Sequence, residues 1–455
     1  MSRTRRPILA LHALLAATLA ASTTPDPTHA ATARADTTVA DAWRLENGLE
    51  VRTLDIPRAA GVAVTLAFRA GSGYEPAGQE GLSELLAELQ FTSAAGDVPE
   101  RTREEMASLR PLGWECRPGT RLVRFTEIAT HAQLPGVLQQ VARRLAGVEV
   151  TDAGVKAALA RVRRDAGTRL FGDPADALYW RPSLIASGES DEQLLRHASL
   201  PGLDRLAARD LAPLLKRWYH AGNASLALVG DLSGFDPHAL VASLFGALPG
   251  GTAMPDTVHV VVRGDKRVTR WKDLAAPAGV VAVGSPALTD SLHPAFYLGM
   301  VITGPSVGHA WGAPSPPLTS RFQYSLFDEP ELVRFYPTVR ADATDPDLLA
   351  GALYEQLQVV GGQAVNATIL DRVRASVRWL LGGELPRDVK ARLRSEAGGL
   401  GTLSNGLATR ALWMGDRFWD DYLRRFDRLK IGHGYFYEWI TDAKHQITLL
   451  LVPAR

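Results

Sequence analysis

The stretch "GSGYEPAGQEGLSELLAELQF", residues 71–91, decides how the first half of the chain is organised. Its first part is rich in glycine and polar residues, which is typical of a loop. From Leu82 onward apolar residues recur at helical spacing, and Glu84 and Glu88 stand one turn apart. Ahead of the loop, "GVAVTLAFRAG" (residues 61–71) is an apolar, Val-rich run that predicts a strand. The sequence therefore predicts strand, loop and helix in that order.

The flanking segments extend this pattern to a mixed fold. "WRLENGLEVRTLD" (43–55) predicts a hairpin turning at Asn47-Gly48. "LPGVLQQVARRLAG" (134–147) and "DAGVKAALARVRRDAGTRL" (152–170) have helical periodicity, and "ARDLAPLLKRWYHAGNASLALVGD" (208–231) reads as a helix, a break and a strand. Strands and helices do not alternate as in a doubly wound parallel sheet, so α+β is the expected class.

A Gly- and Pro-rich segment, "GALPGGTAMPD" (246–256), divides the chain into halves of similar size. The second half repeats the order of the first: strands "TVHVVV" and "AGVVAVGSPAL", a helix from His293, and a terminal strand "QITLLLV". We expect an N-terminal domain over 41–247, a linker over 248–256 and a C-terminal domain over 257–455.

Composition excludes several classes of function. The 455 residues carry a formal net charge of +1, which gives no reason to expect nucleic acid as a partner. One cysteine, Cys116, excludes an internal disulfide framework and a zinc site built on cysteines.

The N-terminus predicts export. Arg3, Arg5 and Arg6 precede an apolar run from Ile8 to about Ala21, and small residues follow up to Ala30. We expect residues 1–30 to be a signal peptide and 31–40 a linker. No later stretch reaches the roughly 18 apolar residues of a membrane span. The expected location is the periplasm or the medium.

Several short motifs occur together in one order. The first strand carries L-x-N-G-L-x-V at residues 45–51, and "AGS" at 70–72 precedes Glu75, Gly78 and Gly81-Leu82. Near the end of the first half, Y-x-x-x-N-x-x-L-x-x-x-G-D spans residues 219–231. In this order and spacing the motifs resemble the insulinase/pitrilysin family of zinc peptidases, and the resemblance covers nearly all of the chain after the signal peptide.

The resemblance implies two similar α+β domains in tandem that close like a clamshell on an extended peptide. It also implies that the peptide adds a strand to an exposed sheet edge. Active members hold catalytic zinc with H-x-x-E-H on the helix that corresponds to residues 82–92, and a glutamate about 75 residues further on supplies the third ligand.

This chain departs from the zinc motif at every position. Glu84 and Glu88 replace the two histidines, and Ala87 replaces the glutamate that acts as general base, so H-x-x-E-H becomes Glu84-Leu85-Leu86-Ala87-Glu88. The third ligand falls near Asp165, beside two arginines. We expect no zinc, no other cofactor and no catalytic residue. Two alternatives stay open for the glutamates: an oxygen-ligated Ca, Mg or Mn site, or two solvated side chains on a helix face.

The second half departs as well. Active relatives have S-R-L-x-x-x-L-R-x-x-x-G-L-x-Y, whose later arginine and tyrosine help to hold substrate. Here Ser320 and Arg321 remain, whereas Phe327 and Arg334 stand at those later positions. These four residues are the candidates for peptide contacts.

The resulting hypothesis is an exported, non-catalytic homologue that forms the inactive, peptide-binding subunit beside an active peptidase of the family. A heterodimer with that subunit or a homodimer is expected. The alternative is a scaffold or binding protein without a peptidase partner. The third possibility is a metallopeptidase with non-standard ligands.

Overall fold

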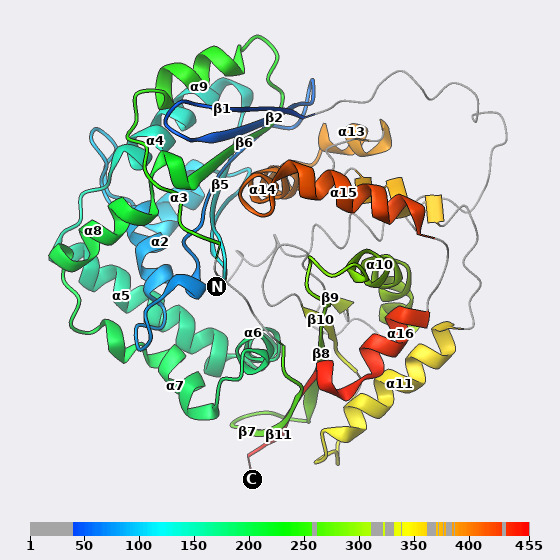
Figure 1. Cartoon of the computed structure of the whole chain (residues 1–455). Helices are drawn as coiled ribbons and strands as arrows, with labels where there is room; N and C mark the ends of the chain where they lie inside the picture. The colour runs from blue at the N-terminus through cyan, green and yellow to red at the C-terminus, as the bar shows by residue number, and fades with distance from the viewer. Residues whose placement is uncertain are drawn as a thin grey trace, which may run out of the picture. The chain divides into compact units, whose positions relative to one another are not determined.

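The computed structural model shows a chain that divides into two compact units, each built around one sheet (Figure 1). Unit 1 takes its residues from Met1–Val162, Pro201–Val258 and Ala375–Leu423, and unit 2 from Arg163–Leu200, His259–Arg374 and Arg424–Arg455. The structure describes residues 40–256, 262–310, 322–323, 332–337, 339–361, 370–371, 373–375, 377–378, 385, 387–429 and 434–454. The expected signal peptide and most of the expected strand "TVHVVV" lie outside these ranges.

Unit 1 contains a six-stranded sheet with the order β1-β2-β6-β3-β5-β4. Its strands are β1 (Asp41–Arg44), β2 (Glu50–Asp55), β3 (Val62–Phe68), β4 (Trp114–Pro118), β5 (Val123–Ala129) and β6 (Ala224–Gly230). β2 and β6 are parallel, and the other pairs are antiparallel. The expected hairpin is confirmed, because β1 and β2 pair around Gly48, whose φ of 92° suits the turn.

Helices cover both faces of this sheet (Figure 1). α2 (Leu82–Thr92) and α4 (Leu134–Ala146) lie on one face, where Leu66 and Glu127 point between them. α14 (Gly398–Leu412) lies on the other face and contacts β2, β3, β5 and β6. On that side the Thr65 hydroxyl hydrogen-bonds to both Thr126 (2.9 Å) and Ser404 (2.6 Å). Small residues in α14 allow this close approach.

Unit 2 contains a five-stranded sheet with the order β7-β11-β8-β10-β9. Its strands are β7 (Asp265–Trp271), β8 (Ala278–Gly284), β9 (Phe322–Gln323), β10 (Leu332–Phe335) and β11 (Gln446–Pro453). α6 (Pro174–Ala186) packs on one face and shares a buried core with Val280, Ala282 and Leu449. α11 (Asp347–Gly361) contacts β8 and β11 from the other face.

Apart from β1, which lies at the outer edge beside β2, the two sheets have the same topology. Counted from β2 in unit 1 and from β7 in unit 2, the first strand runs parallel to the last, and the last is followed across the sheet by the second, the fourth and the third. The duplication expected from the element order is thus present in the fold, and the predicted α+β class with two similar halves is correct.

The units nevertheless exchange helices between the two halves of the sequence. α14 belongs to the second half but completes unit 1, whereas α6 belongs to the first half but completes unit 2. The limits of the compact units therefore do not coincide with the expected boundary at 248–256.

The remaining helices surround the sheets. Those of unit 1 are α3 (Arg103–Leu109), most of α5 (Asp152–Gly167), α8 (Ala208–Trp218), α9 (Pro237–Phe245) and α13 (Arg387–Leu393). Those of unit 2 are α7 (Asp191–Ser199), α10 (His293–Ala310) and α16 (Gly434–Thr441), while α15 (Gly415–Arg428) contributes to both units. No helix in the described ranges is long and apolar enough to span a membrane.

Candidate functional site

The helix that carries the altered motif, α2, begins at a cap supplied by the preceding loop. Both oxygens of Glu75 accept backbone N–H groups at its N-terminus, from Gly81 (3.0 Å) and Ser83 (2.7 Å). Gly78 and Gly81 have φ values of 83° and 85°, which favour glycine. Burial raises the pKa of Glu75 from 4.5 to about 7 and outweighs the two hydrogen bonds. The motif E-x-x-G-x-x-G-L is therefore explained by the start of a helix.

Glu88 lies inside the protein. Its side chain is 1% exposed, and its carboxylate is held between two guanidinium groups. Arg103 donates Nε (2.8 Å) and Nη2 (2.6 Å) to Oε2, and Arg161 donates Nη1 to Oε1. Arg103 and Arg161 are themselves 32% and 23% exposed. The expectation of a solvated side chain is wrong for Glu88.

The two arginines reach Glu88 from different helices. Arg103 is the first residue of α3, whose start is fixed by a capping box between Thr102 and Glu105. Arg161 lies on α5, which is tied to the start of α8 by a hydrogen bond from the Ala208 N–H to Asp152 (2.8 Å). Glu88 thereby links three helices.

The position of the family's general base holds Ala87, whose methyl side chain cannot accept a proton. Ala87 is fully buried, and its carbonyl accepts a weak hydrogen bond from the Cys116 thiol at 4.0 Å. Burial raises the pKa of that thiol, so Cys116 stays protonated at neutral pH. Glu84, one turn earlier on α2, is half-buried.

These residues do not fit a zinc ion. Catalytic zinc needs three protein ligands and an open position, and within the described part of the chain no group of three His, Cys, Asp or Glu side chains is placed to hold a metal. Two guanidinium groups already neutralise Glu88, and a divalent cation beside them would be repelled. The residue of α5 that contacts Glu88 is Arg161, one turn before Asp165.

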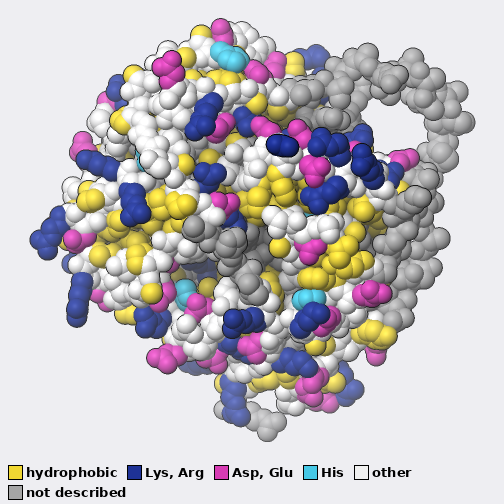
Figure 2. Space-filling model, in the orientation of Figure 1, with side chains coloured by type: hydrophobic (Ala, Val, Ile, Leu, Met, Phe, Trp, Pro, Cys, Tyr) yellow, Lys and Arg dark blue, Asp and Glu magenta, His cyan; other side chains and the backbone are white. Residues whose placement is uncertain are grey.

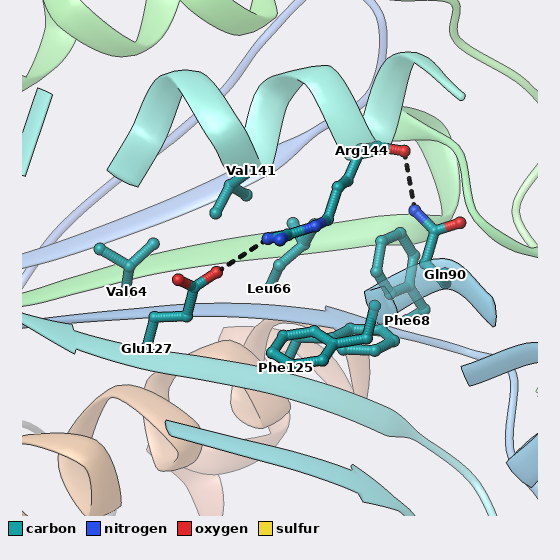
Figure 3. Close-up of a pocket in the computed structure, with 9 residues that line it drawn as sticks. Val64, Leu66, Phe68, Gln90, Phe125, Glu127, Val141 and Arg144 are labelled. Atoms are coloured by element: carbon teal, nitrogen blue, oxygen red, sulfur yellow. Dashed lines mark hydrogen bonds and ion pairs between the residues drawn. The ribbon is translucent and has the colours of Figure 1, made fainter. Parts of the chain in front are cut away.

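A second buried carboxylate, Glu127 on β5, is likewise bound by two arginines, of which Figure 3 draws Arg144. Arg110 Nε and Arg144 Nη1 donate to it at 2.7 and 3.2 Å, and Gln90 Nε2 donates to the Arg144 carbonyl at 2.8 Å. Glu127, Arg144 and Gln90 border a small cavity, which is lined by Val64, Leu66, Phe68, Gln90, Phe91, Phe125, Glu127, Val141 and Arg144. It has room for about one water molecule, so neither a peptide nor a cofactor fits there.

Of the four second-half candidates, Ser320, Arg321 and Phe327 lie outside the residues whose side chains the structure describes. Arg334 is buried on β10 and donates to the Tyr179 carbonyl (3.1 Å) and the Ser183 hydroxyl (2.8 Å) of α6. Its guanidinium also lies 4.5 Å from the centre of the Tyr179 ring. These contacts explain Arg334 as a residue that joins α6 to the second sheet.

Strand β4 lies at one edge of the unit 1 sheet, and its hydrogen bonds to β5 show which of its backbone groups face outward. Gly119 N–H bonds to the Leu122 carbonyl (2.8 Å) and Ile128 N–H to the Gly113 carbonyl (2.8 Å), which sets the alternation between β4 and β5. Odd-numbered residues of β4 therefore bond to β5, whereas Trp114, Cys116 and Pro118 direct their backbone groups away from it. Among the described residues no strand pairs with this outer edge.

Motif residues outside α2 have structural roles. Asn47 donates to the Phe245 (2.7 Å) and Leu248 (3.1 Å) carbonyls. Asn223 donates to the Arg69 (3.0 Å) and Trp218 (2.7 Å) carbonyls. A Cβ on Gly71 would lie 2.3 Å from the Gly119 carbonyl oxygen, so only glycine fits there.

Basic and acidic side chains are interspersed on the face drawn in Figure 2, in keeping with the net charge of +1. On that face no sign of charge gathers into one large patch.

Comparison with solved structures identifies the fold. No family model and no curated protein matches the sequence. A protease from Helicobacter pylori superposes with a TM-score of 0.67 at 16% identity, over 92% of this chain and 100% of that one. The periplasmic protease PqqL from Escherichia coli gives 0.65 at 14% identity, over 91% of this chain and 48% of that one. A peptidase M16 inactive domain from Pseudomonas fluorescens gives 0.56 at 16% identity, over 91% and 98%.

The chain therefore has the fold of the insulinase-type, or M16-like, peptidases. The resemblance read from the sequence motifs is confirmed at the level of the fold.

Proposed function

We propose, from this fold and from the state of the site on α2, that the protein is an exported, non-catalytic homologue of the insulinase-type peptidases. In this role it binds extended peptides and pairs with an active peptidase subunit. The observation that carries the proposal is Glu88, whose buried carboxylate is engaged by Arg103 and Arg161 where an active member would hold its ion.

The division between retained and altered residues supports a non-catalytic role. Residues that this chain shares with the family cap α2, shape its loop and anchor segments of unit 1, as Glu75, Gly71 and Asn223 do. The residues that differ from the family stand at the positions of its metal ligands and its general base. This pattern is expected when the fold is under selection and the catalytic activity is not.

Peptide binding is supported by the outer edge of β4. An extended peptide placed there would pair with the backbone of Trp114, Cys116 and Pro118. Because Pro118 has no N–H group, it offers only its carbonyl, and the donors are limited to Trp114 and Cys116. The peptide would therefore be recognised mainly through its backbone, with little dependence on sequence.

Pairing is supported by the length of one structural relative. PqqL is a periplasmic protease, and this chain covers only 48% of it. A second two-unit body would bring the assembly to a similar size. We assign export to the same proposal, on the N-terminal residues 1–30.

Peptide binding is tested with an extended, fluorescently labelled peptide and two of its N-methylated forms. Methyl groups on alternate residues block the N–H groups on one edge of the peptide strand. We expect one N-methylated form to lose binding and the form methylated on the other residues to keep it. Equal binding of all three peptides contradicts strand addition.

Pairing is tested by purifying the tagged protein from the cells that export it. Recovery of a sibling chain that carries H-x-x-E-H supports the heterodimer. Recovery without such a sibling favours the scaffold alternative. One zinc per chain, together with peptide cleavage that Glu84→Ala abolishes, overturns the non-catalytic proposal.

A further inference from the structure

Residues 246–256, the Gly- and Pro-rich segment that contains the linker expected at 248–256, are bonded along their length to unit 1. The start of this segment is held by the side chain of Asn47, which donates to carbonyls on either side of Gly246. In its middle, Gly251 packs on the ring of His220, where a Cβ would lie 2.5 Å from Cε1. Further on, the Met254 N–H donates to the Asn223 side chain at 2.9 Å. We call residues 246–256 the strap.

The strap ends at an ion pair. Asp256 bonds to Arg121, whose side chain is 8% exposed, against 31% for Asp256. The Arg121 guanidinium also lies 5.0 Å from the centre of the buried Trp413 ring. An ion pair at this degree of burial is strong, because little water screens the two opposite charges.

Arg121 belongs to the turn that joins the edge strand β4 to β5. The loop before α2 crosses this turn with three backbone hydrogen bonds: Gly71 N–H to the Arg121 carbonyl (3.4 Å), Ser72 N–H to Gly119 (2.9 Å) and Gly73 N–H to Thr120 (2.7 Å). The turn is thus held by the loop through its backbone and by the strap through a side chain.

This arrangement bears on β4 because an edge strand has a ladder on one side only. β4 is short and ends at Pro118, next to the turn. A backbone that must accept an added strand binds best when it is already fixed in the paired geometry.

We propose that the strap braces the β4–β5 turn through the Arg121–Asp256 ion pair and so positions the edge strand to receive a peptide. Arg121 and Asp256 are positioning residues, which act through β4 and need not touch the peptide. This inference rests on the proposed binding of peptides at β4. Residues 246–256 belong to unit 1, so they are not a connection between the two units.

The test uses the full-length protein with Asp256→Asn, Arg121→Met and the conservative Asp256→Glu. Hydrogen exchange is read at the N–H groups of Glu115 and Arg117, which bond to β5. We expect exchange at these two amides to become about tenfold faster in Asp256→Asn and Arg121→Met, and to recover in Asp256→Glu. Exchange in β2 and β6 should not change.

The matched control is Asp97→Asn, which removes an exposed ion pair with Arg143 (3.1 Å) elsewhere in unit 1. It should leave Glu115 and Arg117 unchanged. The labelled peptide should bind severalfold more weakly to Asp256→Asn than to the wild type or to Asp97→Asn. Unchanged exchange in both Asp256→Asn and Arg121→Met overturns the brace. If the wild type binds no peptide, the proposed function fails, whereas the exchange result still decides whether the strap holds the turn.

Discussion

Replacing Glu88 by glutamine should lower the opening free energy of α2 more than the same replacement of an exposed glutamate does. Removing one partner of a buried ion pair costs about 3–5 kcal/mol, because the remaining charge is left unpaired. Arg103 and Arg161 keep 32% and 23% exposure, so water can partly solvate them, and we expect about 3 kcal/mol, the lower end of that range.

The arginine variants sharpen this prediction. Arg161→Met should cost about 2 kcal/mol, the range of one hydrogen bond to a charged group. Arg103 would still hold Glu88 through Nε and Nη2. Replacing all three side chains together, by Glu88→Leu, Arg103→Met and Arg161→Met, should return the stability to within about 1 kcal/mol of the wild type, because no buried charge remains.

The measurement is the opening free energy of α2 from native-state hydrogen exchange, since a chain with two units need not unfold in one step. The control is Glu104→Gln on α3, an exposed glutamate, which should change stability by less than about 0.5 kcal/mol. If Glu88→Gln changes stability as little as this control, the Glu88 carboxylate does not link the three helices.

Three further predictions concern the same unit. Restoring the zinc motif by Glu84→His, Ala87→Glu and Glu88→His should give no peptide hydrolysis, because the two arginines that held the carboxylate remain; turnover of a quenched peptide by this variant would contradict that reasoning. Burial raises the pKa of Glu75 from 4.5 to about 7, so between these pH values the folded state binds more protons than the unfolded state, and the free energy of unfolding should fall as the pH rises. Thermal unfolding measured across this pH range should show the fall for the wild type and not for Glu75→Gln. Parallel pH profiles of the two proteins would refute the assignment. Gly71→Ala should lower the unfolding free energy by more than about 2 kcal/mol, because its Cβ would overlap a carbonyl oxygen at 2.3 Å; urea unfolding of unit 1 checks this, and an unchanged midpoint would show that the loop can move aside.

Much of the fold was predictable because its signals are local. The Asn47-Gly48 turn, the apolar Val-rich strands and the periodic helices each depend on neighbouring residues, and the repeated order of elements indicated two similar sheets. The altered motif on α2 could also be read directly from residues 84–88.

The surroundings of Glu88 were not predictable, since its partners are 15 and 73 residues away in the chain. One signal was available: Leu85 and Phe91, three residues before and after Glu88, flank it on the helix surface, which favours burial, and a buried glutamate must be paired. Reading Glu88 as solvated overlooked that rule. The role of residues 246–256 was hidden as well, because Gly and Pro mark both free linkers and segments that pass close to another backbone.

The exchange of α14 and α6 between the halves has a consequence for biogenesis. One face of the first sheet, with the hydroxyl groups of Thr65 and Thr126, receives its cover only when the chain has been made as far as Leu412. During synthesis the N-terminal half is therefore an incomplete folding unit, and a ribosome that stalls in the second half releases a product with an uncovered sheet. Two polypeptides severed between α9 and β7 should each be unstable in isolation yet reassemble when mixed, because each carries the helix that the other lacks.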